Sequence, residues 1–183
     1  MRSPDEWMAE LLAAESAGAL PPLLFFWGHT PRDGHPGPWV LSQWWGAPFE
    51  VEGVVYPTAE AFMMAEKARL FGDETRLAEI LAADHPAAAK DAGRRVTPFD
   101  SAVWDAHRYD AVVRGNVAKF SQHPDLRAYL ASTAPRVLVE ASPADRVWGI
   151  GLSAGDAAAR TPSTWRGSNL LGFALTEVRE RLS

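Results

Sequence analysis

Apolar and polar residues follow a helical period over most of the chain after residue 56, and a strand period only in short stretches. Residues three or four positions apart share one face of a helix, whereas alternate residues share one face of a strand. The pattern therefore predicts a mainly α fold, with one domain and a helical bundle-like core. The expected helices cover residues 58–71, 74–83, 86–95, 101–121, 124–133 and 168–182.

Short apolar runs predict a small accessory β-sheet beside these helices. Residues 23–28 and 136–140 are two such runs, and 147–151 is a candidate strand beside the second. Residues 39–56 are expected to form further short strands, with a tight turn at Glu52-Gly53.

The first 22 residues are expected to form a helical extension (1–22) ahead of the main domain (23–183). Ser3 and Glu6 have the spacing of a capping box, and Pro4 occupies the first helical position. Acidic residues follow at once, which is unlike the basic start of a secretory signal.

Composition and charge narrow the functional class. No run approaches 18 apolar residues, so the sequence predicts no membrane span. The chain has no cysteine, which excludes disulfides and thiolate chemistry and leads us to expect a cytoplasmic protein. A formal net charge of −5 argues against broad electrostatic binding of nucleic acid, although it allows a local basic pocket.

The helix expected at 58–71 places two charged residues, Glu60 and Lys67, within its own apolar stripe. They point the same way, two turns or about 10.5 Å apart, which is too far for a direct ion pair. One interpretation is that their stems are buried and their charged ends reach water. The other is catalytic: desolvation raises the pKa of a carboxyl group and lowers that of an amine, and the neutral forms suit proton transfer and nucleophilic attack. The same period directs Ala59, Met63 and Leu70 inward, and Glu66 and Arg69 toward solvent.

Metal and dinucleotide motifs are absent or out of context. The five histidines lack zinc-ligand spacing, so we expect no metal. Residues 149–154 match a dinucleotide fingerprint, but Pro162 prevents the long helix that a βαβ unit needs, so we expect no cofactor.

Aromatic and basic residues indicate how a substrate could be held. Tryptophans beside loops suit stacking on a base or a sugar, although packing under the loops is the simpler interpretation for each one: Trp27, Trp44, Trp45, Trp148 and Trp165. Two adjacent predicted helices carry cations for a small phosphate pocket: Lys90, Arg94, Arg95, Arg108 and Arg114.

A series of motifs in a fixed order resembles the NADAR (YbiA-like) family. The motifs are LSQWWGAPFEVEGVVYPTAEAFMMAEKA, AGRR, a W-x3-R and a KF in the helix near 104–120, ASPADRVWGIGL, and W-x-G-x-N-x-L-G. Gln43 stands where the family's usual F-S-N-F motif has its amide. The stretch 153–164, which we expect to be a mobile loop, is longer than the typical family connection.

The resemblance implies a mainly helical fold with a small sheet, and an N-glycosidase that cleaves the C1′–N bond of nucleotide-like substrates. We expect phosphorylated ribosylamino-pyrimidine intermediates of riboflavin synthesis as the substrates. Two alternatives stay open: removal of ADP-ribose from guanine in nucleic acid, and a non-catalytic module that binds ADP-ribose or NAD. The sequence gives no indication of the oligomeric state.

By the same resemblance, Glu60 and Lys67 are the catalytic residues. In one mechanism Glu60 moves protons while Lys67 attacks C1′ and forms a Schiff base. In the competing mechanism Glu60 activates water and Lys67 only binds phosphate or hydroxyl groups. The expected substrate-binding residues are Ser42, Gln43, Trp44, Arg94, Arg108, Asp145, Trp148, Gly149 and Asn169.

Overall fold

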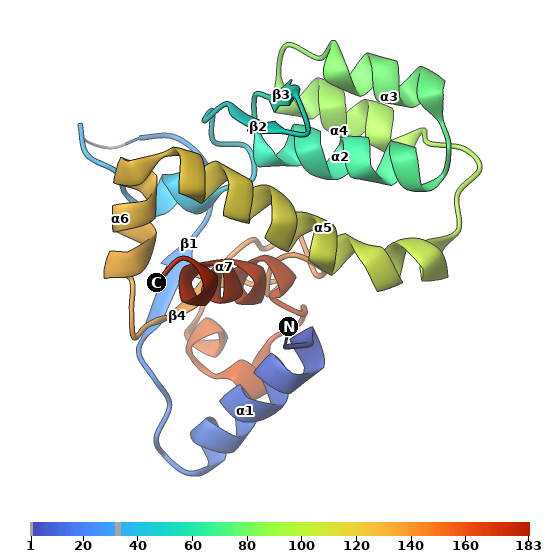
Figure 1. Cartoon of the computed structure of the whole chain (residues 1–183). Helices are drawn as coiled ribbons and strands as arrows, with labels where there is room; N and C mark the ends of the chain where they lie inside the picture. The colour runs from blue at the N-terminus through green and yellow to red at the C-terminus, as the bar shows by residue number, and fades with distance from the viewer. Residues whose placement is uncertain (1, 32–33) are drawn as a thin grey trace. The chain divides into compact units, whose positions relative to one another are not determined.

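The computed structural model describes residues 2–31 and 34–183, which form two compact units (Figure 1). Unit 1 comprises the chain up to Ser42 together with Asp125–Ser183, and unit 2 comprises Gln43–Pro124. The predicted mainly helical fold with small sheets is confirmed. The division into two units was not predicted, and the boundary proposed at residue 23 stays a prediction.

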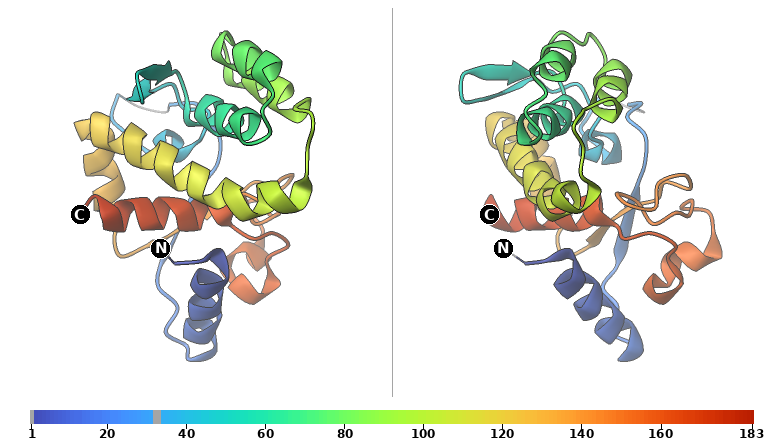
Figure 2. Two further views of the ribbon diagram at one scale, coloured as in Figure 1. Left: turned by 45° about the vertical axis from the view of Figure 1, so that its right-hand side comes forward. Right: turned by 90° about the vertical axis from the view of Figure 1, so that its right-hand side faces the viewer.

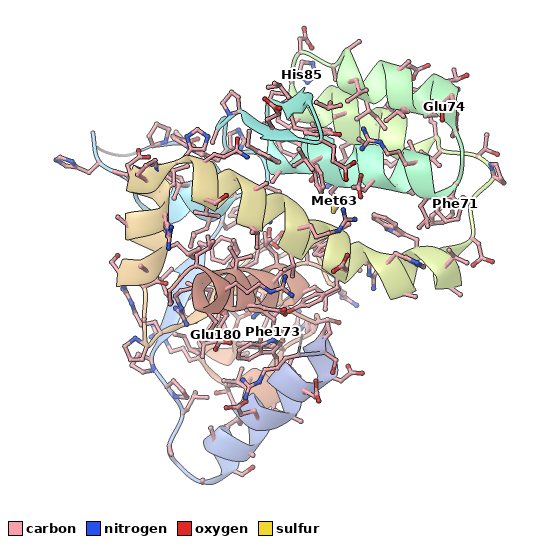
Figure 3. The ribbon with its side chains drawn as sticks, in the orientation of Figure 1. Met63, Phe71, Glu74, His85, Phe173 and Glu180 are labelled. Carbon is pink, nitrogen blue, oxygen red and sulfur yellow. The ribbon has the colours of Figure 1, made fainter. Side chains whose placement is uncertain are left out.

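Unit 1 is built around a pair of parallel strands. Its elements are α1 (Pro4–Ser16), β1 (Leu23–Phe26), the 3-10 helix η1 (Pro38–Leu41), most of α6 (Pro124–Ser132), β4 (Val137–Glu140), the 3-10 helices η2 (Ala157–Arg160) and η3 (Pro162–Thr164), and α7 (Leu170–Arg181). β1 pairs with β4 in register, Leu24 opposite Leu138. α7 packs on β4, and α1 packs on α7, where Trp7 stacks on Phe173 at 6.3 Å between ring centroids. Phe173 is labelled in Figure 3.

Two of the predicted strands are wrong. Residues 38–41 form a 3-10 helix because Pro38 starts the turn, and Trp39, Val40 and Leu41 are buried in succession, which a strand with alternating faces does not allow. Residues 147–151 curl into bends because the Asp145 carboxylate accepts hydrogen bonds from consecutive main-chain N–H groups.

The stretch 153–164 is more ordered than the expected loop. It forms η2 and η3, with the Asp156 side chain capping η2. Ala159 is fully buried against Val139 and Ile150, and the Trp165 indole N–H donates to its carbonyl at 2.8 Å. Small alanine side chains let this segment fold tightly onto the core of unit 1.

Unit 2 consists of a β-hairpin and four helices (Figure 2). The elements are β2 (Phe49–Val51), β3 (Val54–Tyr56), α2 (Ala59–Leu70), α3 (Glu74–Leu81), α4 (Pro86–Arg94) and α5 (Ser101–Gln122). The hairpin turns at Glu52 and Gly53, both with positive φ, as the sequence predicts for a two-residue turn. The Gln122 side-chain amide binds both main-chain groups of Glu50 and so occupies the outer edge of β2.

α2 is the central helix of unit 2, packed by α3, α4 and α5. Met63, labelled in Figure 3, is one of its many buried residues. Two glycines let the neighbouring helices approach closely. A Cβ atom at Gly93 of α4 would lie 2.1 Å from the Met64 sulfur, and one at Gly115 of α5 would lie 2.5 Å from the Phe62 ring.

Candidate functional site

Glu60 lies in the first turn of α2, where Thr58 caps the helix by accepting from the Ala61 N–H at 3.2 Å. The main-chain N–H of Glu60 donates to the Gln43 carbonyl at 2.9 Å. Glu60 is buried, with only 3% of its surface exposed. The Gln43 side-chain oxygen accepts from the Asn116 amide at 2.9 Å. The predicted site residue Gln43 therefore fixes the chain across the start of α2, beside the buried Glu60.

Lys67 lies two turns further along α2. Its Nζ donates to the Gly93 carbonyl at 2.8 Å and lies 4.2 Å from the Phe99 ring centroid and 6.0 Å from that of Trp104. Within the described residues it forms no salt bridge. Burial lowers the pKa of Lys67 below its ordinary value. The side chain is thus an amine that gives up its proton more readily than an exposed lysine does.

The same side of α2 faces α4. Met64 lies between Glu60 and Lys67 on this face and packs on Gly93, whose carbonyl holds Lys67. One turn earlier on α4, the Nζ of Lys90 lies 5.7 Å from the Trp44 ring centroid. We call the group formed by Glu60, Lys67, Trp44 and Lys90 the α2–α4 site. Its members are a buried carboxyl group and an amine on one face of α2, and an indole ring and a cation that contact each other, all within unit 2.

The predicted phosphate-binding arginines fit this site less well than Lys90 does. Arg108 pairs with Asp105 at 2.8 Å, whereas Arg94 is exposed at the end of α4. Arg95 pairs with Glu79 at 3.0 Å. Lys90 forms no salt bridge anywhere in residues 2–31 and 34–183. The sequence placed Lys90 in a basic cluster but could not select it, because its approach to Trp44 depends on how α4 packs.

The opposite side of α2 borders a cavity of about 530 Å³ closed by the hairpin and α5. Glu66 forms ion pairs with both Arg69 and Arg114, and Arg69 also donates to the Tyr56 hydroxyl at 2.6 Å. Arg69 is exposed, as predicted, and Glu66 is half-buried; the ion pairs that they form were not predicted. Leu70 lines the same cavity and is 36% exposed, so its predicted inward position is wrong.

Two motifs near the end of the chain, ASPADRVWGIGL and W-x-G-x-N-x-L-G, supply side chains that bind main-chain groups of unit 1. Asp145 Oδ1 accepts from the N–H groups of Val147 and Trp148, both at 2.8 Å. Asn169, in a left-handed conformation (φ 52°), accepts from the Glu140 N–H at 3.0 Å and donates to the Leu138 carbonyl at 3.0 Å. The side chains of Asp145 and Asn169 thus fix the backbone around β4.

Close backbone contact explains the glycine in the same motif. A Cβ atom at Gly149 would lie 2.8 Å from the Glu140 carbonyl oxygen. Ser42, half-buried, follows η1, and Trp148 is also half-buried. Five predicted substrate-binding residues therefore belong to unit 1, and their contact with substrate stays a prediction: Ser42, Asp145, Trp148, Gly149 and Asn169.

Two classes of site find no support in the described residues. No group of three or more His, Asp or Glu side chains is arranged to hold a metal ion in that part of the chain. No helix among the described elements has the length and apolar character needed to cross a membrane.

Residues 25–183 match the model of the NADAR domain. This chain belongs to the NADAR family. It is 41% identical over 157 residues to N-glycosidase R617 of Acanthamoeba polyphaga mimivirus, an alignment that covers 83% of this chain and 92% of the relative. The solved NMR structure of E. coli YbiA aligns with a TM-score of 0.70 and 31% identity, covering 88% of this chain and 84% of that one.

A third relative, the maize riboflavin biosynthesis protein PYRR (chloroplastic), is 34% identical over 134 residues. That alignment covers 69% of this chain but only 20% of the maize protein. The family predicted from the motifs is confirmed, and so is the class of enzyme, because relatives that cover 83% and 74% of this chain, R617 and E. coli YbiA, carry the name N-glycosidase.

Proposed function

We propose that this protein hydrolyses the C1′–N bond of phosphorylated ribosylamino-pyrimidines, with the α2–α4 site as its catalytic centre. The observation that carries the proposal is the setting of Lys67. Its amine is held by the neutral Gly93 carbonyl and by the Phe99 ring, on the same helix face as the buried Glu60. Burial lowers the pKa of this amine, and the neutral form is the one that can act as a nucleophile.

The proposed reaction begins with attack of the neutral Lys67 amine on C1′. The C1′–N bond to the base breaks as Glu60 gives a proton to the departing nitrogen. The ribose ring then opens at its oxygen, and the lysine adduct becomes a protonated Schiff base. Water adds to C1′, Glu60 takes a proton from it, and the sugar phosphate leaves as the amine is restored.

In the competing mechanism Glu60 activates water directly and Lys67 only binds the substrate. The lowered pKa of Lys67, caused by burial, favours the nucleophilic role, because a lysine that only binds phosphate works best fully charged.

The pyrimidine substrate is supported by the size and charge of the site. Trp44 offers one ring surface and Lys90 one cation without a salt bridge in the described structure, which suits a single base and a single phosphate. The net charge of −5 disfavours long nucleic acid, and the maize relative is named for riboflavin biosynthesis.

The test offers the ribosylamino-pyrimidine phosphates and ADP-ribosylated guanine to one enzyme preparation at matched concentration. Release of free base is followed by chromatography, and we expect release only from the pyrimidines. If only ADP-ribosylated guanine is cleaved, the proposed substrate is wrong, but the protein still cleaves a C1′–N bond. ADP-ribose binding by calorimetry, with no base released over hours, would instead favour a non-catalytic module.

A further inference from the structure

A separate cavity of about 560 Å³ lies in unit 1, and none of its described lining residues belongs to the α2–α4 site. It opens where β1 and β4 end. Gly28, with φ 78°, turns the chain away after β1, while the Ala141 N–H donates to the Phe26 carbonyl at 2.9 Å and holds the two strand ends together. Ligands of α/β proteins commonly bind at the carboxyl ends of parallel strands, which is the location of this cavity.

Aromatic rings dominate its wall. Trp39 is buried in η1, and its indole lies directly against Gly37, where a Cβ atom would be 2.4 Å from the ring. Trp27 is 63% exposed, the highest fraction among the large apolar side chains that the structure describes. A rigid aromatic ring on the rim of a cavity is suited to stacking on a planar ligand.

The charges of the wall restrict the ligand. Among the described residues that line the cavity none is charged, and the polar side chains are the hydroxyls of Thr30 and Ser153. Within this described lining a phosphate meets no cation, whereas a planar ring with a few hydrogen-bonding groups meets rings and hydroxyls. The volume lies within the range of small-molecule sites, about 300–1,000 Å³.

We infer that this cavity binds an uncharged planar heterocycle of nucleobase size, stacked on Trp27. The site does not depend on Glu60 or Lys67. It therefore stands or falls separately from the proposed glycosidase activity.

The test is titration calorimetry of the full chain with adenosine, which has the ring and no charge. Trp27→Ala should weaken binding at least about tenfold, because base stacking on an indole is lost. Trp27→Phe should restore part of the affinity. Leu81→Ala is the control, because it shortens an exposed apolar side chain that lies in unit 2 and is not among the residues lining the cavity. This variant should bind adenosine with unchanged affinity. Circular dichroism of each variant checks that the fold is intact.

Two further arms decide between this cavity and the catalytic centre. Ribose 5-phosphate, which has a charged phosphate and no aromatic base, should not displace adenosine. Glu60→Gln should bind adenosine as the wild type does. Loss of adenosine binding in Trp44→Ala with full binding in Trp27→Ala would place the ligand in unit 2 and overturn the inference. So would the absence of binding to the wild type at millimolar adenosine.

Discussion

The two opposite sides of α2 each carry an acidic and a basic residue, but the partners of the basic residues differ. On the cavity side, Glu66 lies between two arginines, and Arg69 also binds Tyr56. On the α4 side, Lys67 faces a carbonyl and aromatic rings. On the cavity side the arginines pair with a carboxylate and a tyrosine hydroxyl. On the α4 side the Lys67 amine contacts only a carbonyl group and aromatic rings among the contacts described above.

These different partners shift the pKa values of Arg69 and Lys67 in opposite directions. Burial lowers the pKa of Arg69, but its hydrogen bonds to Tyr56 and Glu66 outweigh burial and raise the pKa above the ordinary value. For Lys67, burial acts alone and lowers the pKa. A charge with a counter-charge contributes to structure, while a charge held by neutral groups remains available for chemistry.

The largest expected effect is that of Lys67→Met, which keeps the stem and removes the amine. Turnover should fall at least about 10³-fold, as for loss of a nucleophile. The melting temperature should stay the same or rise, since a partly buried charge is removed. Arg69→Met on the other side is the matched control and should keep turnover while lowering the melting temperature. A large loss of stability in Lys67→Met would mean that Lys67 is a structural residue.

Glu60→Gln should leave the fold intact and reduce turnover about 10²-fold or more, the usual scale for a general acid–base. The amide is close in shape to the carboxyl group, so packing at the start of α2 is preserved. Single-turnover base release measures the effect. Cleavage at the wild-type rate would remove Glu60 from the proton transfers.

Lys119 of α5 tests whether a lowered pKa is enough to indicate catalysis. It is fully buried, and burial lowers its pKa to about 7 from the ordinary 10.5. Between these values the unfolded chain holds a proton that the folded chain has lost, so the free energy of unfolding should rise with pH above 7, by at most about 1.4 kcal/mol per pH unit. Below pH 7 the cost of burying the charge is fully present.

Lys119→Met should abolish that pH-dependent slope in urea denaturation and leave base release nearly unchanged. Loss of activity in this variant, with normal stability, would show that the chemistry is not confined to the α4 side of α2.

Glu66→Gln should have the smallest effect, about 1–2 kcal/mol of lost stability, because hydrogen bonds to two partly exposed arginines are weakened. Turnover per folded molecule should change by less than about threefold. Abolished turnover at an unchanged melting temperature would mean that the cavity side takes part in the reaction.

Local features of α2 could be predicted because local sequence causes them. Thr58 caps α2 at the residue where the helix expected at 58–71 begins, and Glu60, which the helical period places in the apolar stripe, is buried. The turn at Glu52-Gly53 likewise depends only on adjacent residues and their positive φ angles.

Partners distant in the chain could not be predicted. Lys67 binds a carbonyl 26 residues away and a ring on the loop after α4, neither of which carries a sequence signal for that contact. The same limit applies to Glu66, whose second arginine lies 48 residues further along the chain. The bends after Asp145 were missed because one carboxylate replaces the pairing of a strand.

Borohydride trapping tests whether Lys67 is the nucleophile, because reduction makes a Schiff base between enzyme and sugar permanent. The enzyme is incubated with ribosylamino-pyrimidine phosphate and borohydride, digested, and mapped by mass spectrometry. We expect one sugar phosphate adduct on Lys67, formed in Arg69→Met and absent in Lys67→Met. Full turnover of the wild type with no adduct on Lys67, under conditions that inactivate a known Schiff-base enzyme, would contradict this role.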